Sequence, residues 1–230
     1  MRQRPEHAIR TLLRATRTPD SDVFDAIFNA FVTLLVTIDP PGLAPLFLAL
    51  TGGMNRAERA QVGLRASIIA FAILALFAVA GTTILAVFGI TLPAFRVAGG
   101  LLLFYIAFEM IFERRNERKE KSADAAITVD HIRNIAAFPL ALPLIAGPGA
   151  ISATVLLSGT FDSAPHRALL VAIIAACIGL TWLVFIAAER IDRFLGETGR
   201  SILTRLLGVI LAALAVQFVA DGIKALMAAA

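Results

Sequence analysis

The sequence predicts an all-α protein that crosses a membrane six times, as two groups of three spans with opposite topology. The chain of 230 residues is 58% hydrophobic and only 17% charged, whereas soluble domains carry about 25% charged residues. Apolar runs of about twenty residues, the length of a membrane-spanning helix, recur along it. Two of these runs are interrupted by prolines and glycines at corresponding places in the two halves.

Six apolar segments are expected to span the membrane, and they are 23–50, 66–89, 92–112, 135–157, 168–188 and 201–227. The connection 113–134 is long and charged, and it separates a first three-span repeat (23–112) from a second (135–227). Residues 1–22 are basic. They are expected to form a surface helix on anionic lipid, or to be an extension that precedes the true start. A secretory signal is disfavoured, because the apolar run that follows is too long.

The two halves match when their interruptions are paired. Pro41 and Gly42 then correspond to Pro148 and Gly149, and Arg96 lies opposite Arg205, two residues out of register. Each half holds three spans, which is an odd number, so the second half must enter the membrane from the opposite side. An inverted-topology repeat with discontinuous first and fourth spans is typical of many secondary transporters.

The first interruption carries a carboxylate. Proline lacks an N–H and clashes with the preceding turn, so Pro40, Pro41, Gly42 and Pro45 cannot continue a helix. Asp39 lies 16 residues after Val23 and 11 before Leu50, too far from either end to reach water. A carboxylate there favours a role in ion or proton coupling, or in binding a cationic substrate. The alternative role is capping the N–H groups that the break frees.

The second interruption consists of Gly147, Pro148 and Gly149, and it has Ala146 where the first has Asp39. A half-helix begins after each interruption, with free N–H groups and the positive end of its dipole. In an inverted repeat both ends approach the midplane, where they suit a carboxylate or phosphate. The alternative is that the prolines only kink two helices.

Charged and small residues in spans three and six complete the predicted site. Arg96 and Arg205 are expected to close a cavity from opposite faces, to pair with Asp39, or to extend toward lipid headgroups. Gly99, Gly100 and Gly208 are expected to allow close helix packing. The predicted substrate or ion site is therefore Asp39, Pro40, Pro41, Gly42, Pro45, Gly147, Pro148, Gly149, Arg96 and Arg205.

The sequence contains no motif for catalysis, metal binding or nucleotide binding. Its histidines all lie outside the apolar runs, Cys177 is the single cysteine, and zinc, Walker and hydrolase motifs are absent. No enzymatic activity, cofactor or metal is therefore expected. The net charge of +4 reflects arginine-rich loops after spans one, three and five rather than nucleic-acid binding. Because arginine-rich loops usually face the cytoplasm, these loops are expected to be cytoplasmic and both termini periplasmic. The arginines near the N-terminus argue against this orientation.

Three stretches resemble the MarC family of bacterial inner-membrane proteins, named for an association with a multiple antibiotic resistance locus. They are 39–47, 95–100 and 139–151, and the resemblance extends over about 23–227. It implies a six-span cytoplasmic-membrane protein in a superfamily with small-molecule exporters that resemble the lysine exporters, and it supplies no substrate. The basic N-terminal extension departs from the family pattern.

Together these features predict a secondary transporter that exports a small anionic or amino-acid-like solute. The alternative is a scaffold or lipid-binding membrane protein that transports nothing. The expected partners are the lipid bilayer and a small molecule or ion, and a homo-oligomer is compatible with either function.

Overall fold

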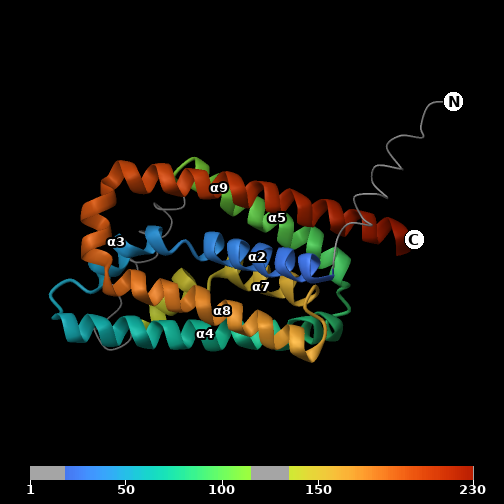
Figure 1. Ribbon diagram of the computed structural model, residues 1–230, viewed down its shortest axis with the longest axis horizontal. Helices are drawn as coiled ribbons and strands as arrows, with labels where there is room; N and C mark the ends of the chain where they lie inside the picture. Colours follow the sequence, from blue (N-terminus) through green and yellow to red (C-terminus); the bar gives the residue numbers. More distant parts are fainter. Residues whose placement is uncertain (1–18, 115–134, 230) are drawn as a thin grey trace.

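The computed structural model describes residues 19–114 and 135–229 (Figure 1). Predictions for residues 1–18 and 115–134 lie outside these ranges. Five helical segments in the described ranges are long and apolar enough to cross a bilayer, and one bent pair makes a sixth when counted as one span. The protein is therefore an all-helical multi-pass membrane protein, as predicted. The elements in chain order are α2 (Pro19–Ile38), α3 (Pro40–Leu50), α4 (Arg56–Val87), α5 (Leu92–Ile111), η1 (Ala136–Ile145), α7 (Pro148–Ser158), α8 (Ala164–Ile186) and α9 (Ala188–Ala229).

Both predicted interruptions are present, and they differ in shape. The prediction that Gly42 and Pro45 cannot continue a helix is wrong, because both lie inside helix α3, which begins at Pro40. Helices α2 and α3 are separated only by Asp39 and together form one candidate span of 28 residues, Val23–Leu50. The irregular segment η1 and helix α7 are bent by 58°. Inside η1, Phe138 and Leu142 have extended backbone, each directly before a proline, which is the conformation that a following proline favours.

Two predicted boundaries are wrong, for the same physical reason. Helix α4 begins at Arg56, ten residues before the predicted 66, because Asn55 and Glu58 form a reciprocal cap at its start. Helix α9 begins at Ala188, so the predicted loop after span five is helical, with an interruption at Gly196 (φ 58°). Apolar runs mark where a chain is buried in lipid, whereas the helix continues into polar residues with good helix propensity.

Helices α2 and α7 lie in the middle of the bundle, between the α5–α9 pair and the α4–α8 pair (Figure 1). Burial follows this arrangement. In the first span 67% of the apolar window is buried, against 28% in α4 and 22% in the last span. The centre of the protein is therefore built around the two interrupted segments.

Helices α5 and α9 pack closely through glycines. A Cβ on Gly100 would lie 2.9 Å from the Ala215 carbonyl oxygen, and one on Gly208 would lie 3.2 Å from that of Ala107. These contacts show that the two helices run antiparallel. Gly99 in turn packs on Leu156 of α7. The prediction that these glycines serve helix packing is confirmed, as expected where small residues let helices approach in lipid.

Helices α4 and α8 also run antiparallel, because Gly63 near the start of α4 contacts Phe185 near the end of α8. The outward faces of the bundle are apolar. An apolar face on a multi-pass helix is solvated by lipid acyl chains rather than by water. On α9 the exposed apolar side chains include Ile202, Leu206, Val209, Ile210 and Val216.

Candidate functional site

The first interruption is closed by its own hydrogen bonds. Asp39 donates its N–H to the Leu35 carbonyl at 2.9 Å, and its carbonyl accepts the Leu43 N–H at 3.2 Å. Its Oδ1 accepts the N–H of Gly42 at 3.2 Å. Pro40 and Pro41 have no N–H to satisfy. The free N–H groups predicted at the start of α3 are therefore absent, because the prolines remove two donors and Asp39 occupies the others.

Asp39 combines burial with a strained backbone. It is 0% exposed, and its φ of 59° and ψ of 64° lie in the left-handed region, which costs an ordinary side chain about 1–2 kcal/mol. Asp and Asn tolerate this region best, because their short polar side chains bond to nearby backbone. The capping role is thus confirmed.

The second interruption has no such cap. Helix α7 begins with Gly147 at the capping position and Pro148 after it, and no side chain caps this end. The Ile151 N–H bonds to the Gly147 carbonyl at 3.0 Å. The half-buried Gly147 lies directly against the carbonyl oxygen of Pro143, where a Cβ would not fit. The start of α7 therefore keeps the positive end of its helix dipole without a compensating carboxylate of its own.

The two interruptions meet in the bundle. Gly149, in the first turn of α7, is buried against Thr37 of α2 and Ile106 of α5, and a Cβ at 149 would lie 3.3 Å from the Thr37 methyl carbon. Thr37 is two residues before Asp39. The structure therefore brings the start of α7 against the end of α2.

The neighbourhood of this contact contains buried hydroxyl groups. Thr33, Thr37 and Thr154 are each at most 2% exposed. Thr37 donates its Oγ1–H to the Thr33 carbonyl at 2.6 Å, and Thr154 donates to the Ala150 carbonyl at 2.8 Å. Their oxygens retain acceptor capacity. The centre of the bundle thus holds the Asp39 carboxylate, several hydroxyl oxygens and an uncapped helix start.

Arg205 lies away from this centre. It is exposed and pairs with Glu113, with 3.1 Å between Arg205 Nη2 and Glu113 Oε1. Glu113 follows the end of α5 in a left-handed conformation, φ 62°, and also accepts the Ser201 hydroxyl. The hydrogen bond from Ser201, followed by that from Arg205, lowers the pKa of the Glu113 carboxyl. The carboxylate partner of Arg205 is thus Glu113, at the end of α5, rather than Asp39.

Arg96 lies at the opposite end of the same helix pair. It is half-buried in the second turn of α5, next to Val97, which packs on Gly222 near the end of α9. The two arginines therefore lie at opposite ends of the α5–α9 pair, and neither joins the two interruptions. Pro40 is buried, Pro41 and Pro45 are half-buried, and Pro148 is exposed.

Several features escaped the sequence analysis. Glu113 bonds to Ser201 and Arg205 at the start of span six. Arg59 of α4 pairs with Glu189 of α9 at 2.5 Å. Loop charges in a sequence indicate topology, and partners 88 to 130 residues apart leave no local pattern. Among the described residues, no three His, Cys, Asp or Glu side chains come together to hold a metal ion.

A helical bundle with an interrupted central span and a buried carboxylate defines a polytopic integral membrane protein. Residues 24–227 match the MarC family of integral membrane proteins. The chain belongs to this family.

Relatives occur in bacteria and in archaea. The chain is 40% identical over 197 residues to a UPF0056 membrane protein of Archaeoglobus fulgidus, covering 85% of this chain and 91% of the relative. It is 37% identical over 202 residues to the UPF0056 membrane protein YvbG of Bacillus subtilis, covering 88% and 96%. For YhcE of Escherichia coli the identity is 35% over 204 residues, covering 87% and 93%. No solved structure matches the chain.

Proposed function

We propose that this protein is a secondary transporter, an exporter of a small anionic or amino-acid-like solute, rather than an enzyme. The observation that carries the proposal is the contact between the two interruptions, where Gly149 packs on Thr37 two residues before the buried Asp39. An ionisable group inside a membrane costs several kcal/mol, so its presence favours a functional role. Sites at interrupted helices near the midplane are typical of secondary transporters.

The packing of equivalent helices supports an inverted repeat. Spans three and six, α5 and α9, are antiparallel partners, and so are spans two and five, α4 and α8. The interrupted segments α2 and α7 also contact each other. A two-fold axis in the membrane plane would relate the halves in this way. Alternating access would then follow from motion of one half against the other.

The inequality of the two interruptions favours a zwitterion over a simple anion. Asp39 caps α3 and offers negative charge, whereas the start of α7 is uncapped and offers the positive end of a dipole. An amino-acid-like solute has a carboxylate for α7 and an ammonium group for Asp39. A proton or cation on Asp39 would serve the same purpose for an anion.

Flux through proteoliposomes tests the function. We expect gradient-driven flux of at least one member of a panel of amino acids, organic acids and lipid-linked anions. Asp39→Asn should abolish it, while Asp162→Asn, at an exposed aspartate in the loop after α7, should not. The proposal fails if no panel member moves and Asp39→Asn cells behave as wild type.

We further propose that the protein resides in the cytoplasmic membrane with periplasmic termini. The arginine-rich loops after spans one, three and five support this orientation through the positive-inside rule. A reporter fused after the last span should be active only outside the cytoplasm. Cytoplasmic activity of that reporter would reverse the topology.

A further inference from the structure

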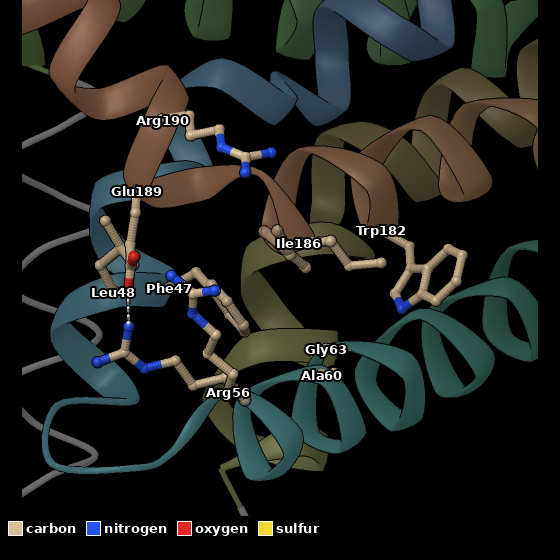
Figure 2. A pocket seen from close by; sticks show the side chains of 11 residues that line it. Phe47, Leu48, Arg56, Ala60, Gly63, Trp182, Ile186, Glu189 and Arg190 are labelled. Carbon is tan, nitrogen blue, oxygen red and sulfur yellow. Dashed lines mark hydrogen bonds and ion pairs between the residues drawn. The ribbon is translucent and has the colours of Figure 1, made fainter.

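A cavity of about 230 Å³ opens at the far end of α3, away from the interruptions. It lies between the first turns of α4, the end of α8 and the start of α9 (Figure 2). Its charged lining consists of Arg56, Arg59, Glu189 and Arg190. Three guanidinium groups around one carboxylate make it an electropositive recess at the edge of the apolar bundle.

One of the three arginines, Arg59, already forms an ion pair. Arg59 pairs with Glu189 at 2.5 Å and donates its Nε–H to the Thr51 carbonyl at 3.3 Å. Arg56 and Arg190 form no ion pair within the part of the chain that the structure describes. The nearby Glu58 is engaged in the cap of α4, where it accepts the Asn55 N–H at 2.8 Å. Two positive charges therefore remain for a ligand.

The inner wall of this cavity is aromatic. The rings of Phe47 and Phe185 stack at 4.5 Å between centroids, and Trp182 also lines the cavity, on the side away from Arg56 and Glu189 (Figure 2). The indole Nε1–H of Trp182 is buried with no acceptor among the described residues. A buried donor without a partner costs free energy, so this wall suits a ligand with an acceptor group near its apolar part.

Trp182 also borders a second cavity of about 230 Å³, between α4 and α8. Apart from Ser67 and Trp182, its lining is apolar, with Leu64, Ile68, Phe71 and Ile178 among it. Gly179 leaves open space there, since a Cβ at 179 would meet nothing within 4 Å. A charged recess and an apolar groove thus adjoin at a single indole ring.

We propose that these adjoining cavities bind an anionic phospholipid. Its phosphate lies between Arg56 and Arg190, and an acyl chain passes Trp182 into the groove between α4 and α8. Guanidinium groups form strong bidentate bonds with phosphate oxygens, and indole rings favour the boundary between headgroups and acyl chains. The apolar groove favours a lipid over a free phosphate ion. This inference does not depend on transport.

Trp182 is the one tryptophan in the chain, so its fluorescence reports on this site alone. The full-length protein is reconstituted in phosphatidylcholine vesicles that contain either dibrominated phosphatidylglycerol or dibrominated phosphatidylcholine. Bromine quenches indole on contact. Because each arginine near an anionic headgroup contributes about 1 kcal/mol and two are available here, we expect half-maximal quenching at about thirtyfold lower mole fraction of the anionic lipid.

The double variant Arg56→Gln/Arg190→Gln should remove this preference, and each single variant should reduce it. Arg65→Gln, at an exposed arginine of α4 outside the cavity, should preserve it. Gly179→Leu fills the apolar groove without altering charge, and should weaken quenching by both lipids. This last variant keeps the test decisive if the double variant does not fold.

Equal quenching by the two lipids would overturn the proposal, and so would a preference that survives in the double variant. Inorganic phosphate supplies the remaining comparison. If millimolar phosphate abolishes the anionic preference at constant ionic strength, the ligand is a soluble anion and the lipid assignment is wrong. If phosphate has no effect, the acyl chain is required, as proposed.

Discussion

Asp39 Oδ1 accepts the backbone N–H of Gly42 at 3.2 Å, and the two residues leave no room between them. A Cβ at position 42 would clash with the Asp39 carboxylate. This relationship explains why the first interruption needs both an acid and a glycine. The acid closes the start of α3, and the glycine allows the carboxylate to sit directly against the helix end.

Gly42→Ala should therefore displace the carboxylate and leave a buried acceptor and donor unpaired. We expect the free energy of unfolding to fall by about 1–3 kcal/mol, measured as a lower thermal midpoint in detergent. Gly179→Ala is the matched control, because a methyl group there enters open space and alanine is the better helix former. It should be neutral or slightly stabilising. Equal losses in both variants would show that the Asp39 contact is unimportant.

Two substitutions at Asp39 separate its capping role from its charge. Asparagine tolerates the left-handed region and can still accept the Gly42 N–H, so Asp39→Asn should unfold close to the wild-type temperature yet lose transport. Asp39→Ala loses the cap as well, and should be less stable by about 1–2 kcal/mol. Thermal unfolding and proteoliposome flux are measured on the same preparations. Full transport by Asp39→Asn would reduce this residue to a structural cap.

The contact between the interruptions can be tested by a compensating pair. Gly149→Ala places a methyl group against the Ile106 Cδ1 atom, and overpacking of this kind costs about 1–3 kcal/mol. Ile106→Val removes Cδ1 at a cost of about 0.5–1.5 kcal/mol. The double variant should be more stable than the sum of the two single effects predicts. Strict additivity in thermal unfolding would mean that residues 106 and 149 are not in contact.

The sequence predicted the interruptions well because prolines at 40, 41 and 148 cannot continue a preceding helix but are well suited to begin a new one. It also identified Asp39 and the packing role of Gly100. It could not show how the start of α3 is capped. Pro40 and Pro41 have no N–H groups, and Asp39 accepts the N–H groups of the two residues that follow them. Nor could it place Arg205, since its partner Glu113 is separated from it by 92 residues, and no local period encodes such a pair. The predicted start of the last helix, α9, was wrong because hydropathy measures lipid contact rather than helix propensity.

The Glu113 contact predicts a dependence of stability on pH. Its carboxyl pKa is lowered from 4.5 by the Ser201 and Arg205 contacts. A carboxyl whose pKa is lower in the folded state stabilises the protein above its unfolded pKa, and this contribution disappears as pH falls through the folded value. The stability difference between wild type and Glu113→Gln should therefore be full at neutral pH and disappear as pH falls through the lowered pKa of the folded state. Glu197→Gln, at an exposed glutamate near the start of span six, is the control and should show no such trend. A Glu113→Gln difference that persists unchanged at the acid end would mean that the carboxylate charge contributes nothing to fixing α5 on α9.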